Sequence, residues 1–220
     1  AGRLAALLFA AACLVPPAAH AQYFGRNKVQ YDSFEFQVLE TEHFDIYYYE
    51  DAEPIIDEAA RMSERWYARL SRLLDHQLRG RQPLILYTNH PDFRQTNALF
   101  GDIGEATGGA TEALKRRIVL PLAGPLAESD HVLGHELVHA FQYDITSAPS
   151  GGVGFRAPTA LALPLWFIEG MAEYLTYGPV DANTAMWMRD AAACGCELPT
   201  LKDLRNNACL LYTSDAADEE

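Results

Sequence analysis

A pair of histidines inside an apolar stretch, His135 and His139, constrains the fold of this chain more than any other feature. Residues four apart lie on one face of an α-helix, so both imidazoles can reach a single ion. Glu136 is rotated away from both histidines, which places its carboxylate beside such an ion. That arrangement suits a base that acts on metal-activated water. For this stretch alone, a structural helix with two unrelated histidines is the alternative.

A second apolar segment, Leu165 to Tyr174, carries two acids that are also four residues apart, Glu169 and Glu173. A catalytic zinc site needs a third protein ligand and an open fourth position, and Glu169 is the candidate for that ligand. Glu173 can accept the free ring N–H of a ligating histidine, which fixes its tautomer. Acids in an apolar helix are costly unless they are paired or bind a metal, so the two segments together predict one zinc ion. Two imidazoles and a carboxylate would also accept cobalt or manganese.

Four further side chains are candidates for secondary roles at this site. His131 precedes His135 by four residues and shares its helix face. We interpret it as a histidine at the rim of the site, with contact to metal or substrate as the alternative. Amide hydrolysis also needs a donor that stabilises the oxyanion. Tyr143, Tyr174 and Tyr177 can each supply one, and the sequence does not rank them.

The two ends of the chain are expected to lie outside the folded domain. Residues 1–21 are typical of a signal peptide, because Arg3 precedes a short apolar run, and Ala19 and Ala21 fit the small residues before a signal-peptidase cut. The run is too short for a permanent anchor, so no transmembrane segment is expected in the mature chain. Residues 209–220 resemble the translation of a sequencing adapter, with a disordered acidic tail as the alternative. We therefore expect the natural protein to be longer.

Composition limits the number of domains and the class of partner. Residues 22–208 suit one globular domain, because 49% of the chain is hydrophobic and its 220 residues are too few for two full domains and a linker. The formal net charge is −13 and the sequence pI is about 4.9, so a nucleic-acid partner is not expected. Charge excludes that class of partner and selects no other.

Hydrophobic periodicity predicts strands in the first part of the domain and helices in the second. Alternating apolar residues (Phe34, Phe36, Val38) predict two strands within residues 34–49, and a helix that begins at Pro54 and ends at Gly80 follows them. The other expected elements are, in chain order, a strand over 83–88, a loop over 89–109, a hairpin or two edge strands over 110–114 and 117–122, and helices from Ser129 or Asp130 to Tyr143, from Pro164 to Tyr177 and from Ala182 to Ala193. We therefore expect an α+β domain, with a small strand-rich N-terminal part followed by helices that carry the metal site.

The two helical segments resemble the gluzincin branch of HExxH zinc metallopeptidases, in which a Trp-x-x-Glu-Gly-x-Ala-type helix gives the third ligand. The resemblance implies a zincin-like fold in which His135, His139 and Glu169 bind zinc, Glu136 is the catalytic base and Glu173 is the acid that supports a ligand. The metzincin branch does not fit, because Gln142 stands where its glycine would be and Ile145 where its third histidine would be. Residues 108–121 resemble the edge strand along which such enzymes lay an extended substrate.

A narrower resemblance covers nearly all of residues 22–208. Residues 22–28 and 41–48 resemble large bacterial envelope proteins, in which a peptidase-MA-like domain precedes a TolB-like β-propeller. The resemblance implies that a C-terminal β-propeller is missing from this chain. The spacing from His139 to Glu169 exceeds that of the compact aminopeptidase pattern, because residues 147–158 are inserted. The shape of the family's pocket therefore does not transfer to this chain.

The expected activity is zinc-dependent hydrolysis of a peptide bond in a peptide or protein substrate, with Glu136 as general base. The protein is expected to be exported from a bacterial cell and to be periplasmic, associated with the outer envelope, or secreted. The alternative is a catalytically silent, zinc-stabilised envelope module that binds peptides or a protein partner. The presence of Glu136 favours the enzyme, since a silent site has no need of the base. Endopeptidase and exopeptidase activity both remain open.

Overall fold

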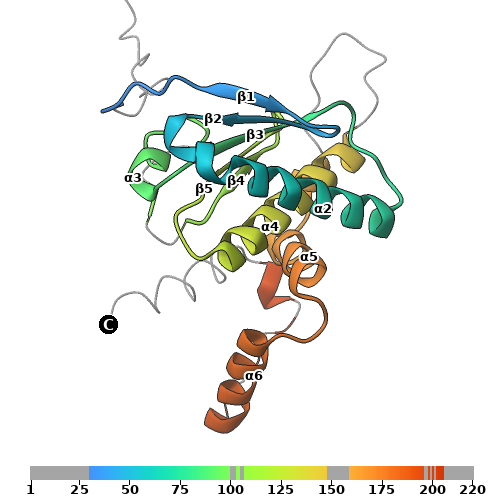
Figure 1. The fold of residues 1–220 in the computed structure, drawn as a ribbon. Helices are drawn as coiled ribbons and strands as arrows, with labels where there is room; N and C mark the ends of the chain where they lie inside the picture. Colours follow the sequence, from blue (N-terminus) through green and yellow to red (C-terminus); the bar gives the residue numbers. More distant parts are fainter. Residues whose placement is uncertain are drawn as a thin grey trace, which may run out of the picture.

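The computed structural model describes residues 30–99, 103–104, 107–147, 159–195, 198, 200 and 202–205. The expected signal peptide, the adapter-like tail and most of the predicted loop over 147–158 lie outside these residues. The described part is an α+β structure in which one sheet is covered by helices on one face (Figure 1). This confirms the predicted α+β class.

The sheet has five strands in the order β1-β2-β3-β5-β4. The outer pairs, β1 with β2 and β4 with β5, are antiparallel, whereas β2, β3 and β5 run parallel to one another. The antiparallel pair of β4 and β5 confirms the predicted hairpin, with β4 at the edge of the sheet. The strands are β1 (Gln37–Glu40), β2 (Phe44–Tyr48), β3 (Gln82–Tyr87), β4 (Ala110–Glu112) and β5 (Arg117–Pro121).

The main core lies between the sheet and two helices, α2 (Ile56–Leu74) and α4 (Leu126–Thr146). Ile46, Leu84 and Ile118 are in register across the three parallel strands and are fully buried on the face toward these helices. Their apolar side chains explain why the helices pack there, since burial of apolar area is the main driving force of folding. The sheet and α2 thus form the support on which α4 rests (Figure 1).

The first strand is shorter than the alternating residues predict. β1 begins at Gln37, three residues after the expected start, and the side chains of Phe36 and Val38 are 38% and 47% exposed. Leu39 packs against the main core instead. Phe36 makes edge-to-face ring contacts with Tyr49 and Tyr87, within a second and smaller aromatic cluster. The ring of Phe36 therefore packs against Tyr49 and Tyr87, and Phe36 itself lies outside β1.

Two helix boundaries also differ from the prediction. A 3-10 helix, η2 (Glu50–Ile55), contains Pro54 and precedes α2, which ends at Leu74 instead of Gly80. Asp75 ends it by adopting a left-handed conformation with φ 47°, and its N–H bonds to the carbonyl of Ser71. Aspartate is one of the few residues other than glycine that adopts this conformation readily.

The helix with the histidine pair starts earlier than expected. α4 begins at Leu126, and Pro125 takes the capping position that the sequence assigned to Ser129 or Asp130. The fixed φ of proline suits a helix start, and its carbonyl accepts from the backbone N–H groups of Glu128 and Ser129. The remaining helical elements are α3 (His90–Phe93), η3 (Thr159–Ala162), α5 (Leu165–Tyr177), α6 (Ala182–Cys194) and η4 (Asp203–Arg205). Of these, α3 lies in the predicted loop, and α6 extends away from the sheet with every residue at least partly exposed (Figure 1).

Helix α4 approaches α2 closely because Gly134 has no side chain. A Cβ atom at this position would lie 2.6 Å from the indole ring of Trp66 on α2. The same indole donates through Nε1 to Asp130, one turn earlier on α4, at 2.9 Å. Gly134 and Asp130 together fix the height and rotation of α4 against α2, and His135 is the next residue along the helix.

Asp144, near the C-terminal end of α4, joins that helix to two other parts of the chain. Its side chain is 1% exposed and contacts His76 Nε2 at 2.8 Å, Arg79 Nε at 3.1 Å and Arg116 Nη2 at 2.8 Å. His76 and Arg79 lie between α2 and β3, and Arg116 lies in the turn of the β4–β5 hairpin. One carboxylate therefore anchors α4 to the α2–β3 connection and to the β4–β5 turn.

We expect Asp144→Ala to lower the free energy of unfolding by about 3 kcal/mol, at the low end of the range for a broken buried ion pair, because its cationic partners are half-exposed and regain water. Urea denaturation followed by circular dichroism measures this change. Glu58→Ala is the matched control, since it removes the exposed pair of Glu58 with Arg61. Equal losses in the two variants would contradict the anchoring role of Asp144.

Candidate metal centre

The predicted site residues come from two helices that cross the site in opposite directions. His131 on α4 faces Glu173 on α5, and His139, two turns later on α4, faces Glu169, which precedes Glu173 by one turn. Figure 1 shows α4 and α5 side by side below the sheet. Residues four apart lie on one face of a helix, so the histidine face of α4 can lie opposite the acidic face of α5.

Two ring nitrogens from α4 and one carboxylate oxygen from α5 converge on one point. His135 Nε2 lies 3.1 Å from His139 Nε2, and Glu169 Oε2 lies 3.2 Å from each of the two nitrogens. A tetrahedral zinc ion with bonds of about 2.0–2.1 Å holds its ligand atoms about 3.3 Å apart. The triangle of His135, His139 and Glu169 is therefore of the size that such an ion requires, and its donor set is one that zinc accepts.

Each histidine is held through its other ring nitrogen. His135 Nδ1 lies 2.9 Å from Glu173 Oε1, the position in which the carboxylate accepts the ring N–H. His139 Nδ1 lies 2.9 Å from Gln142 Oε1, and the amide nitrogen of Gln142 donates to the backbone carbonyl of Ile168 at 3.0 Å. With a cation in the triangle, these contacts would keep the proton of each histidine on Nδ1 and direct both Nε2 lone pairs at the same point.

Gln142 is a site residue that sequence reasoning missed. In the sequence it served only to exclude the metzincin pattern, although it follows His139 by three residues and therefore lies on the same helix face. In the structure it is 5% exposed and links the ring of His139 to the backbone of α5. The three-residue spacing places Gln142 next to His139. Its second contact, with the backbone of α5, depends on how the two helices pack.

Glu136 is buried beside the triangle and contacts the sheet edge. Its residue exposure is 7%, and the hydroxyl of Thr111 on β4 lies 2.6 Å from Oε2 and 2.8 Å from its backbone carbonyl. Burial raises the pKa of Glu136, although His139, Thr111 and His135 act in the opposite direction. A Cβ atom at Gly109 would lie 3.1 Å from Glu136 Cγ, so the strand passes directly over this side chain.

The electrostatics of the triangle favour positive charge. Burial lowers the pKa of His135, but hydrogen bonds with Glu169 and Glu173 raise it to about 10. Burial raises the pKa of Glu169, but His135 and His139 hold it at about 2. Three carboxylates thus surround two imidazoles, and the arrangement binds protons when no other cation is present. A divalent cation meets the same electrostatic demand.

The structure distinguishes the side chains with predicted secondary roles. His131 does not belong to the triangle; its Nε2 lies 3.5 Å from Glu173 Oε2, and its ring stacks on Tyr177 with a centroid distance of 3.8 Å. Tyr143 lies nearly parallel to the ring of His139 at 6.2 Å. Burial, followed by the charges of Glu169 and Glu136, raises the pKa of its phenol. Tyr174 is 57% exposed.

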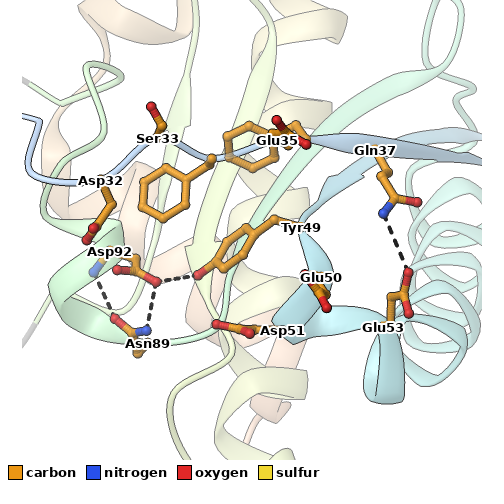
Figure 2. Close-up of a pocket in the computed structure, with 12 residues that line it drawn as sticks. Asp32, Ser33, Glu35, Gln37, Tyr49, Glu50, Asp51, Glu53, Asn89 and Asp92 are labelled. Atoms are coloured by element: carbon orange, nitrogen blue, oxygen red, sulfur yellow. Dashed lines mark hydrogen bonds between the residues drawn. The ribbon is translucent and has the colours of Figure 1, made fainter.

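A separate hollow of about 850 Å³ lies at the start of β1 and is shown in Figure 2. There Tyr49 points its hydroxyl at Asp92, at 2.6 Å, and Asn89 donates to the same carboxylate at 2.7 Å. Burial, with help from Asp92, raises the pKa of Tyr49 to about 12. The hollow shares no residue with the His/Glu triangle. Its acidic lining residues are Asp32, Glu35, Glu50, Asp51, Glu53 and Asp92.

Comparison of the chain with protein-family models, with curated proteins and with solved structures gives no significant match. Among the described residues, no helix has both the length and the apolar character that crossing a membrane demands. The functional argument therefore depends on the geometry of the site itself.

Proposed function

We propose that this chain is the catalytic domain of a zinc-dependent peptidase with a zincin-like fold. The observation that carries the proposal is the triangle of His135 Nε2, His139 Nε2 and Glu169 Oε2, with sides of 3.1 to 3.2 Å. His135, His139 and Glu169 would hold a zinc ion there, and that ion would supply Lewis-acid chemistry toward a carbonyl and toward water. Three protein ligands leave a fourth position open, which is what a catalytic site requires.

Glu136 is the proposed general base. Its carboxylate takes a proton from the attacking water and then donates it to the leaving amine. A raised pKa brings the group closer to the pH at which it must both accept and release a proton. The hydroxyl of Thr111 contacts Oε2 at 2.6 Å and fixes the direction of the carboxylate. The other oxygen is therefore the one available to the water.

The substrate class follows from the strand above the site. β4 is an edge strand that contributes Thr111 to Glu136, so a segment paired with β4 would pass beside the base. Extended peptides bind exposed strand edges through main-chain hydrogen bonds. This arrangement supports a peptide or an unfolded protein segment as substrate, with its scissile bond beside Glu136.

The proposal includes an envelope location. Residues 1–21 are typical of a signal peptide, and the resemblance of residues 22–208 to envelope proteins adds a C-terminal β-propeller beyond this chain. The zinc-stabilised binding module is the competing function. The buried position of Glu136 and its bond to Thr111 favour catalysis, since a silent site would gain nothing from a buried carboxylate that does not bind the metal.

The test is cleavage of a peptide library by the zinc-loaded chain, with products identified by mass spectrometry. We expect cleavage that 1,10-phenanthroline abolishes and added zinc restores. Stoichiometric zinc without cleavage of any library member would reject the peptidase and favour the binding module. Cleavage that survives the chelator would assign the activity to a contaminant or to another site.

Thr111 offers a more specific test of how the base is held. We expect Thr111→Val to lower kcat about 10- to 100-fold, the range that corresponds to losing one hydrogen bond to a charged group. Thr111→Ser, which keeps the hydroxyl, is the matched control and should retain most of the activity. Zinc content and thermal stability are measured on the same samples. If the serine and valine variants lose equal activity, the hydroxyl is not what positions Glu136.

A further inference from the structure

The metal-site helices carry more ligand-type side chains than one ion uses. On α4, His131, His135 and His139 follow one another at four-residue intervals, and on α5 Glu169 is followed by Glu173 at the same interval. One helical turn is about 5.4 Å long. The set of His131, His135 and Glu173 therefore repeats the sequence spacing of the first triangle one turn along each helix, and its ligand atoms all lie within 4.8 Å of one another.

Glu173 divides its two oxygens between the two histidines that flank it. Oε1 lies 2.9 Å from Nδ1 of His135, and Oε2 lies 3.5 Å from Nε2 of His131. The first distance is a hydrogen bond. The second is close to the separation of two ligand atoms on a tetrahedral ion, about 3.3 Å. Glu173 can therefore support His135 with one oxygen and offer the other, together with His131, to a second ion.

The two side chains of this outer pair are held in place and accessible. The ring of His131 stacks on Tyr177 with an interplanar angle of 18°, which fixes the plane of the imidazole. Glu173 is fixed by its bond to His135. The side chains of His131 and Glu173 are 19% and 47% exposed, so a hydrated ion can reach them. Fixed ligands bind a metal with less loss of conformational freedom than mobile ones.

We propose that His131 and Glu173 form a second, weaker divalent-cation site, which binds zinc about one helical turn from the first. Two protein ligands hold this ion and water completes its coordination, because Nδ1 of His135 keeps its proton for Glu173. The smaller ligand number, the greater exposure and repulsion between the two ions make it weaker than the first site by at least about 100-fold. The proposal concerns metal binding and does not require peptidase activity.

The experiment is a zinc titration of the full chain in competition with a chromophoric chelator. We expect two classes of site in the unmodified chain. His131→Phe should remove the weaker class, because phenylalanine keeps the stacking on Tyr177 but has no ring nitrogen, and should change the affinity of the tighter class less than about threefold. Glu173→Gln keeps an acceptor for His135 and should weaken the outer class at least about tenfold.

His43 provides a matched control elsewhere in the chain. Its ring stacks on Tyr67 at 3.8 Å and lies 2.6 Å from a carboxylate, Glu64, so it reproduces the surroundings of His131 outside the helix pair. His43→Phe should leave both classes of site intact. A single class in the unmodified chain, survival of the weaker class in His131→Phe, or its loss in His43→Phe would each overturn the proposal. Absence of peptide cleavage would bear on the proposed peptidase and leave this result unaffected.

Discussion

Glu136→Gln is expected to lower kcat/KM for peptide cleavage by about 10²- to 10⁴-fold, the contribution typical of a positioned general base. Glutamine has the shape of glutamate and still accepts the hydrogen bond from Thr111, but it cannot take a proton from water. The substitution also replaces a buried acid by a neutral group, so it should not unfold the protein.

Zinc affinity and melting temperature of the same variant provide the control. Because Glu136 is not one of the three converging ligands, both should remain close to those of the unmodified chain. Loss of zinc together with activity would show that Glu136 binds the metal, and retained activity with zinc bound would show that another group is the base. Either result would contradict the proposed division of roles.

Glu169→Ala is expected to reduce zinc affinity by more than the 10- to 100-fold that follows removal of a residue which only supports a ligand. The reason is that Glu169 supplies one of the three converging atoms, at 3.2 Å from each histidine nitrogen. Without it, two imidazoles face the ion and no anionic ligand remains at the site. Competition titration with a chelator measures the change.

Glu173→Ala is the matched control, because it removes an acid of the same kind one turn along the same helix. Its effect on the tight site should fall in the 10- to 100-fold range, since Glu173 contacts His135 through the ring nitrogen that does not face the triangle. The opposite ranking of the two variants would mean that the tightly bound ion sits in the set of His131, His135 and Glu173.

The residues of the triangle could be predicted because all of them lie in regular helices. Four-residue spacing determines which side chains share a helix face, and that rule holds whatever the helices pack against. The same rule predicts an amphipathic helix at α2, where Met62, Trp66 and Leu70 are buried. The two ends of that apolar series, Ile55 and Leu73, are exposed instead. The general α+β arrangement followed from the change of hydrophobic period along the chain.

Residues that act through long-range contacts could not be predicted. Thr111 is 25 positions from Glu136 in sequence, and two of the partners of Asp144 lie 65 and 68 positions before it, so these roles depend on how the sheet packs on α4. Phe36 followed the strand pattern yet packs against rings of the smaller cluster. Hydrophobic periodicity indicates whether a segment is a helix or a strand, but not which residues pack against it.

One missed element did have a local signal. Asn89 caps α3 by accepting from the backbone N–H of Asp92 at 2.8 Å, and Pro91 stands in the first turn. An asparagine followed closely by proline and an acid is typical of a helix start. The Asn, Asp and Gly content of residues 89–109 as a whole favours a loop and hides this local signal.

The proposed metal site is tested most directly by the metal content of the purified full chain after dialysis, measured by elemental analysis alongside protein concentration. We expect one zinc per chain, retained through dialysis because three fixed side chains converge on it. A chain that refolds normally but retains no zinc, and takes up none when it is supplied, would show that His135, His139 and Glu169 do not form a zinc site.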